Sequence, residues 1–181
     1  RIRKITLIGH SMGGYVSLAL TERYPEMIRG LCLLNSSSLS DTSARKKLRV
    51  RANKMVKSNF ENMVRMSFVN LFCEESKTAF KSKIENALGE ALKTPLQGYI
   101  ASQEGMRVRL NRMWVLKNNR FKKLFILGKK DPVLSESETL AEAKKTQSEA
   151  VLLSGGHMSH IENTDSLIKA LNRFIKQSLN Y

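Results

Sequence analysis

The segment Gly9–Gly14, with the sequence GHSMGG, constrains this chain most strongly, because it places a serine between glycines at a change of pattern. The apolar run Ile5–Ile8 before it is typical of a short buried strand, and Tyr15–Tyr24 after it is rich in apolar residues and is predicted as a helix. A serine on a sharp turn from strand to helix presents its hydroxyl above the sheet edge, and the next amide can donate to a developing oxyanion. The segment therefore predicts Ser11 as a nucleophile and the Met12 N–H as an oxyanion donor.

This glycine-rich segment has two other interpretations. A tight turn with an incidental serine is the plain structural alternative. A phosphate-binding loop is disfavoured, because neither G-K-[ST] nor G-x-G-x-x-G follows the strand. The nucleophile interpretation accounts for both the preceding strand and the following helix.

Strand and helix patterns alternate at both ends of the chain, and a long helical stretch separates them. Strands are predicted at Ile5–Ile8, Ile28–Leu34, Lys123–Leu127 and Ala150–Leu153, and helices at Tyr15–Tyr24, Ser135–Thr146 and from Ile161 or Glu162 to Gln177. Between them, helical periods cover Leu48–Val56, Phe60–Phe72 and Phe80–Leu92, and a further helix starts at Thr94-Pro95. Because strand–helix–strand units favour a parallel sheet, we predict an α/β fold. Residues 1–35 and 117–181 would form its core, and residues 36–116 a helical cap insertion.

A serine nucleophile needs a base, and the chain has only three histidines. His157 lies in the loop between the last predicted strand and the last helix, at the end of a strand where α/β sites assemble. We therefore predict His157 as the base. His160, at the start of the helix, is the weaker alternative and is expected to cap or pack. His10 adjoins the nucleophile and is expected to pack against the flanking structure.

The acid that orients the base should follow a strand and precede the histidine. Asp131 in the segment GKKDP does both, and Pro132 restricts the turn that holds it. A turn-stabilising aspartate is the alternative, and Asp41 and Asp165 lack the position after a strand. The predicted order along the chain is thus Ser11, Asp131, His157.

These motifs, GHSMGG after a strand, LGKKD, and GHMSHIEN before an amphipathic helix, resemble the α/β-hydrolase superfamily with a helical cap. The resemblance covers residues 3–178 and implies a Ser-His-acid hydrolase of the esterase type that needs no cofactor or metal. It also implies that the cap excludes water and selects the substrate. Substrate identity is not implied.

The chain departs from this family in what precedes its first strand. Family members usually carry four further strands, two helices and an oxyanion loop of His-Gly type before it. The resemblance therefore implies that this chain is the C-terminal part of a longer protein, with the last four strands of the sheet. The strand that bears Ser11 would lie at an open edge, and Met12 would be the remaining donor of the usual oxyanion pair.

The formal net charge of +15 raises the question of an anionic partner such as nucleic acid or a membrane surface. The basic residues concentrate in residues 41–57 and 99–130, with a single tryptophan and no nucleic-acid motif, so a solvated cationic surface is the simpler interpretation. No apolar run is long enough to span a membrane. The two cysteines, Cys32 and Cys73, show no metal-ligand spacing and read as buried small side chains, which favours a reducing, cytoplasmic location.

The leading functional hypothesis is a serine hydrolase of an apolar ester or similar acyl substrate, with thioester and C–C bond hydrolysis left open. The alternative is a non-catalytic or truncated ligand-binding protein of the same fold. Substrate-binding residues are not identified. Seven apolar side chains could line an acyl pocket or simply form core: Met55, Phe60, Met63, Met66, Phe68, Phe72 and Trp114.

Overall fold

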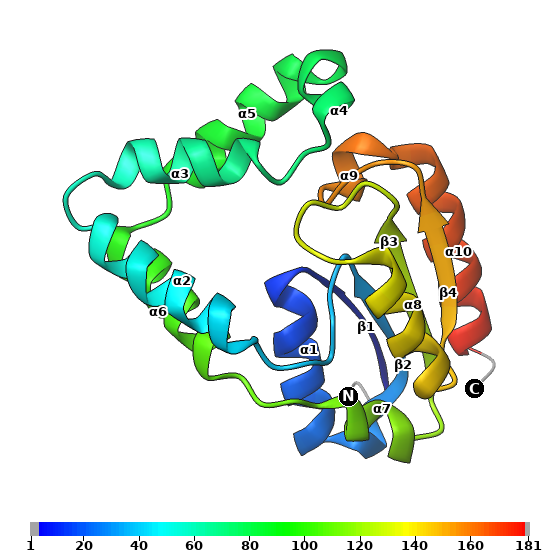
Figure 1. The fold of residues 1–181 in the computed structure, drawn as a ribbon. Coiled ribbons are helices and arrows are strands. Elements are labelled where there is room, and N and C mark those ends of the chain that lie inside the picture. Colours follow the sequence, from blue (N-terminus) through cyan, green and yellow to red (C-terminus); the bar gives the residue numbers. More distant parts are fainter. Residues whose placement is uncertain (1–3, 180–181) are drawn as a thin grey trace.

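The computed structural model describes residues 4–179, and a parallel sheet organises it (Figure 1). The strands are β1 (Ile5–His10), β2 (Ile28–Leu34), β3 (Lys122–Gly128) and β4 (Glu149–Leu153), in the order β1-β2-β3-β4. All three pairings are parallel. The predicted α/β class with a four-stranded parallel sheet is confirmed, and β1, which bears the serine turn, lies at one edge.

Helices cover both faces of the sheet, which is why the central strands are apolar throughout. Successive side chains of β2 alternate, so Leu31 and Leu33 face one layer and Cys32 and Leu34 the other. The first layer contains α1 (Met12–Arg23), α7 (Met113–Asn118) and α8 (Glu136–Lys145), and the second contains α10 (Thr164–Leu179). A 3₁₀ turn (Pro25–Met27) leads into β2, and the short helix α9 (Ser159–Glu162) precedes α10.

The helices between β2 and β3 leave these layers and form two arms (Figure 1). They are α2 (Ser43–Met55), α3 (Phe60–Val69), α4 (Glu74–Ala79), α5 (Lys81–Leu92) and α6 (Leu96–Val108). Helix α2 packs beside α6, and α3 packs beside α5. Helix α7 packs against the sheet core, where its Val115 and Leu116 are buried. The helices that project from the core therefore end before residue 116, the predicted limit of the cap insertion. We call α2–α6 the helical insertion.

Several predicted element limits differ from the structure. Helix α1 begins at Met12 and not at Tyr15, because the two glycines continue the helix instead of preceding it. The period over Phe60–Phe72 ends as a helix at Val69, and α4 follows as a separate helix that was not predicted. The C-terminal helix is two helices, because Asn163 leaves the helical conformation and its Oδ1 accepts a bond from the Gly155 N–H.

Both cysteines are free and buried, as expected from the apolar run around Cys32. Burial raises the pKa of the Cys32 thiol to about 12, so this sulfur is unreactive at neutral pH. Among residues 4–179, no helix is long and apolar enough to cross a membrane.

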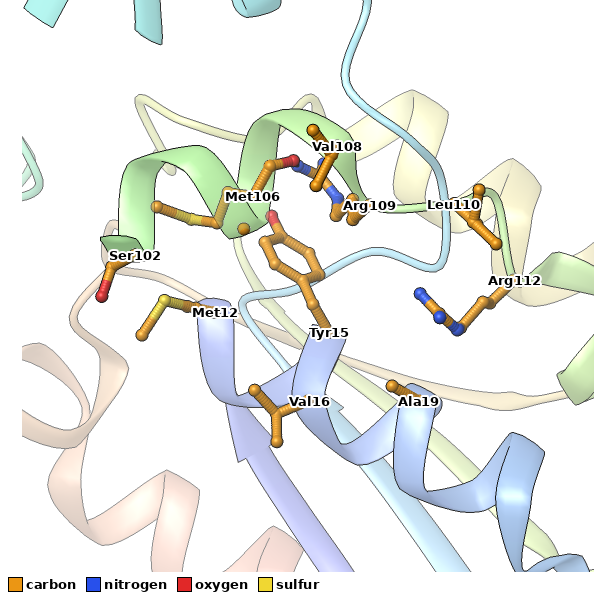
Figure 2. Close-up of a pocket in the computed structure, with 11 residues that line it drawn as sticks. Met12, Tyr15, Val16, Ala19, Ser102, Met106, Val108, Arg109, Leu110 and Arg112 are labelled. Atoms are coloured by element: carbon orange, nitrogen blue, oxygen red, sulfur yellow. The ribbon is translucent and has the colours of Figure 1, made fainter. Parts of the chain in front are cut away.

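The first strand and helix leave several large apolar side chains exposed. They are Ile8 of β1, Met12, Val16 and Leu20 of α1, and Tyr24 directly after α1. Figure 2 shows a pocket between α1 and the segment from Ser102 to Arg112, and its volume is about 360 Å³. Tyr15 stands in its middle, with Arg109 across from it.

Candidate active site

The turn that carries Ser11 is strained and crowded. Ser11 has a φ of 51°, a left-handed conformation that costs a residue with a side chain, and its N–H donates to the Leu34 carbonyl at 2.9 Å. A Cβ on Gly9 would lie 2.5 Å from the Gly13 carbonyl oxygen, and one on Gly14 would lie 2.6 Å from the Cβ of Ser36. Glycine at positions 9 and 14 therefore lets strand and helix approach closely. A Cβ on Gly13 would meet nothing within 4 Å, so crowding does not explain that glycine.

The structure brings Ser11, His157 and Asp131 together from the ends of three strands. The Oγ of Ser11, after β1, lies 2.8 Å from Nε2 of His157, which follows β4. The other ring nitrogen, Nδ1, lies 2.8 Å and 3.0 Å from the two carboxylate oxygens of Asp131, which follows β3. His157 is only 2% exposed. Parallel strands place their carboxyl ends at one edge of the sheet, which is why residues 146 positions apart meet.

The Asp131 carboxylate accepts several hydrogen bonds besides those of His157. Its Oδ1 accepts from the N–H groups of Val133 and Leu134 at 2.8 Å and 3.0 Å, and Asn35 donates to Oδ2 at 3.1 Å. Burial raises the pKa of Asp131, but the hydrogen bond and charge of His157 and these donors outweigh it, so the pKa lies below its ordinary value. The carboxylate is therefore charged at neutral pH and fixes Nδ1 of His157 as a donor.

Asn35 is a site residue that the sequence analysis missed. It follows β2, is fully buried and has a φ of 44°. Besides Asp131, its amide donates to the Gly156 carbonyl at 3.1 Å, and its Oδ1 accepts from Ser159 at 2.7 Å. It thus joins the acid loop to the histidine loop. The sequence feature that could have identified Asn35 is its place directly after a buried strand, at the same edge of the sheet as Ser11.

The other candidate bases and acids take different positions. His10 packs beside His157 as expected, with ring centroids 5.5 Å apart, and its Nε2 donates to the His157 carbonyl at 2.9 Å. Burial lowers the pKa of His10 to about 4, which keeps the ring neutral. His160 is exposed and meets His10 edge-on. Asp41 pairs with arginines of the helical insertion, and Asp165 lies on α10, so Asp131 alone of the three bonds His157 in the described structure.

Met12 is the first residue of α1. The N–H groups of a helix's first turn have no partner within the helix, and this end of the helix dipole favours negative charge. Ser11 makes no side-chain cap to them. The Met12 N–H therefore remains the candidate donor to an oxyanion formed beside Ser11.

The histidine loop is also tied to the helical insertion. The His157 N–H donates to the Leu71 carbonyl at 3.1 Å. The buried Glu162 accepts from the Met158 N–H at 2.9 Å and from the Cys73 N–H at 3.1 Å. The position of the loop therefore depends on the chain segment between α3 and α4.

A cavity of about 310 Å³ lies over Ser11 and His157. Side chains of the helical insertion form most of its wall, including Arg45, Arg49, Val64, Ser67, Phe68, Leu71, Ala91, Thr94, Tyr99, Gln103 and Met106, with Tyr15 and Val133 from the core. Of the seven apolar side chains considered above, Phe68 lines it. Phe72 is buried in a cluster with Ile84 and Met158, while Met55, Met66 and Trp114 are exposed, so helical spacing predicted the lining poorly.

Residues 4–179 hold no group of three or more histidine, cysteine, aspartate or glutamate side chains that could bind a metal ion. The site described above contains a serine, a histidine, a carboxylate and main-chain N–H groups. That donor set suits acyl chemistry through a covalent serine intermediate.

A serine on the turn after one strand of a parallel sheet, with an aspartate and a histidine after two later strands, defines a class of α/β proteins. This chain belongs to that class by sequence as well: residues 1–164 match the alpha/beta hydrolase fold family, of which it is a member.

Solved structures agree with this assignment. A thermophilic esterase from Thermogutta terrifontis is 26% identical, with a TM-score of 0.89 over 97% of this chain and 65% of its own length. The enol-lactonase from Burkholderia xenovorans LB400 is 18% identical, with a TM-score of 0.86 over 97% of this chain and 66% of its own, and shows the fold alone. The chain thus spans about two thirds of these proteins.

A curated relative matches over a shorter stretch. The 1-acylglycerol-3-phosphate O-acyltransferase ICT1 of Saccharomyces cerevisiae is 46% identical over 35 residues, which is 19% of this chain and 9% of the yeast protein.

Proposed function

We propose that this chain carries the catalytic residues of a serine hydrolase that cleaves esters or similar acyl substrates. The observation that carries the proposal is the hydrogen-bonded series Asp131–His157–Ser11, with both contacts of the imidazole at 2.8 Å. Ser11 would be the nucleophile, His157 the general base and Asp131 the group that orients the imidazole and stabilises the imidazolium. The Met12 N–H would stabilise the oxyanion.

The geometry supports the following sequence of steps. The Oγ of Ser11 bonds to the substrate carbonyl carbon while Nε2 of His157 takes the hydroxyl proton. The imidazolium, stabilised by the Asp131 carboxylate, then returns that proton to the leaving alcohol as the ester bond breaks. Water then attacks the acyl carbon while His157 takes its proton. The proton passes to the Oγ of Ser11 as the bond between the acyl group and the serine breaks, which releases the acid. Acid–base transfer contributes about 10²–10⁴ in rate, and an oxyanion donor about 10²–10³.

The comparisons support this proposal at a coarser level. The Thermogutta protein is described as an esterase, and this chain spans 65% of it, so the proposed activity is that of the whole protein. The apolar part of the cavity wall favours a small substrate with a hydrocarbon portion. The free buried cysteines favour a cytoplasmic location.

The direct test is labelling by an active-site-directed fluorophosphonate, together with hydrolysis of p-nitrophenyl acetate and butyrate by the full-length protein. We expect the label on Ser11 and loss of at least about 10⁴ in kcat in Ser11→Ala. The exposed Ser82 on α5 provides the matched control, because Ser82→Ala should retain both label and activity. A well-folded protein that takes no label at Ser11 would refute the proposal. Saturable ester binding without turnover would instead favour a ligand-binding protein of this fold.

A second candidate is acyl transfer to an alcohol other than water. It is favoured by the short match to an acyltransferase, and it uses the same acyl-serine intermediate. The acceptor decides between the two reactions. If 1-acylglycerol 3-phosphate added to the assay takes the acyl group in preference to water, the protein is a transferase, and if free acid remains the product, it is a hydrolase.

A further inference from the structure

The wall of the cavity over Ser11 is chemically mixed. Val64, Phe68 and Leu71 of the helical insertion contribute apolar side chains. Arg45 and Arg49, both from α2, contribute cationic side chains. A substrate in this cavity therefore meets both hydrocarbon and positively charged residues.

The charge of Arg49 is already matched within the protein. Asp41 is buried, and its carboxylate accepts from Arg49 Nε at 2.5 Å and from Arg109 Nη1 at 2.6 Å. Arg49 also donates to Gln103 at 2.7 Å, and Arg109 lies over the Tyr15 ring, 3.9 Å from its centroid. Burial raises the pKa of Asp41, but these arginines outweigh it and hold the pKa below its ordinary value. The one carboxylate of this cluster is thus shared by two arginines.

Arg45 is different. Its guanidinium donates to the main-chain carbonyl of Val133, and no carboxylate of residues 4–179 forms an ion pair with it. Glu138 lines the smaller neighbouring cavity together with Arg45 but lies beyond ion-pair distance. The side chain is half-buried, and a cation held away from water is costly unless an anion accompanies it.

We propose that Arg45 binds an anionic group of the substrate, a carboxylate or a phosphate, while the apolar side chains of the cavity wall contact the hydrocarbon portion. The planar guanidinium has donors to spare beside its bond to Val133, and both anions accept two of them in parallel. This proposal deepens the proposed function and rests on the cavity over Ser11 being the substrate site. The specificity group would then come from the helical insertion and the reacting groups from the core.

Binding measured without turnover tests the proposal independently of catalysis. In the full-length protein with Ser11→Ala, calorimetry would compare monomethyl glutarate with dimethyl glutarate, and glycerol 3-phosphate with glycerol. We expect at least one anionic probe to bind roughly ten times or more tightly than its neutral partner, from a charge-assisted hydrogen bond. The pair that shows the preference distinguishes carboxylate from phosphate.

Variants on α2 assign the effect to one side chain. Arg45→Gln should abolish most of the preference for the anion, and Arg45→Lys should restore part of it. The exposed Arg51 on the same helix is the matched control, and Arg51→Gln should leave the preference unchanged. Equal affinity for charged and neutral probes, or a preference that survives Arg45→Gln, would overturn the proposal.

Kinetics then separate this proposal from the proposed function. With active protein, the kcat/KM ratio of mono-p-nitrophenyl glutarate to p-nitrophenyl pentanoate should fall about tenfold or more in Arg45→Gln. A merely structural role of Arg45 would lower both values alike and leave the ratio unchanged, which counts against the proposal. If no ester is cleaved while the Arg45-dependent binding preference persists, the hydrolase proposal fails and the anion site stands.

Discussion

The sheet core and the helical insertion are stabilised in different ways. In the core, β2 and β3 are buried over most of their length, and their side chains pack into apolar clusters on both faces. In the insertion, α2 and α6 have no buried residue at all. The insertion is held by the Asp41 ion cluster, by hydrogen bonds between the segment 71–73 and the histidine loop, and by a small apolar cluster in which Phe72 and Ile84 pack with Met158 and Ile161. The proposed reacting groups thus lie on the extensively buried part of the molecule, whereas the cavity wall is attached to that part by one small apolar cluster and by polar contacts.

A pair of phenylalanines offers the strongest test of this difference. Phe125 on β3 is 1% exposed, and Phe125→Ala should lower the free energy of unfolding by about 3–5 kcal/mol, because it leaves a cavity in the core. Phe68 on α3 is half-buried and lines the substrate cavity. Phe68→Ala should cost about 1 kcal/mol or less of stability and act mainly on KM for esters with long acyl chains. Urea unfolding and steady-state kinetics measure the two effects, and similar stability losses in both variants would contradict the comparison.

The pH dependence of stability should reveal the buried histidine of the core. Burial lowers the pKa of His10 from 6.5 to about 4, so between these values the unfolded chain binds more protons than the folded one. Stability should therefore fall as the pH falls through this window, by up to about 3 kcal/mol between pH 7 and pH 4. Asp131 has a pKa below its ordinary value of 3.8 and stays charged across the window.

Urea unfolding at a series of pH values would measure this slope. His10→Asn should remove most of it, while His160→Asn should remove a smaller part, because burial lowers the pKa of His160 as well. A slope that is the same in all three proteins would show that His10 is not its source.

The ion cluster at the base of the insertion should act on the insertion more than on the core. Asp41→Asn leaves Arg49 and Arg109 without their shared carboxylate and should cost about 2 kcal/mol, since charged groups held away from water lose their partner. Hydrogen exchange should then rise in α2 and α6 and stay slow in β2 and β3. The exposed pair Lys93–Glu90 serves as the control, because Glu90→Gln removes an ion pair of little value. Uniform acceleration across both regions would argue against a separately attached insertion.

The smallest expected effect concerns the hydrogen bonds of Glu162, which connect the insertion to the loop of His157. Glu162→Gln keeps the shape of the side chain, but its amide nitrogen cannot accept, so one of the two bonds from the Met158 and Cys73 N–H groups is lost and the histidine loop should be held less firmly. We expect kcat to fall about tenfold, equivalent to about 1.4 kcal/mol, with little change in KM. The exposed Glu85 on α5 is the control. Unchanged kcat and an unchanged pH profile in Glu162→Gln would show that these hydrogen bonds do not position His157.

Much of the core was predictable because its patterns are local. An apolar run followed by glycines and a helix identifies the Ser11 turn without knowledge of any other part of the chain. Asp131 and His157 are then the candidate acid and base because each follows a later strand, and the carboxyl ends of parallel strands lie at the same edge of the sheet. The element limits were less accurate, because glycines such as Gly13 and Gly14 can stand within a helix as well as before one.

The contacts between distant segments were not predictable in this way. Asn35 forms hydrogen bonds with groups 96, 121 and 124 residues away. A periodic pattern of apolar residues cannot predict partners so far apart in the sequence. The lining of the cavity depends on how α2 and α3 cross the core, and the helical spacing of Met55, Met66 and Trp114 did not reveal that they face solvent. Local spacing along the chain was sufficient to predict the parallel sheet, the serine turn and the candidate acid and base. The Asn35 bridge, the hydrogen bonds of Glu162 and the unmatched charge of Arg45 became visible only in the folded molecule, because each depends on which distant side chains burial brings together.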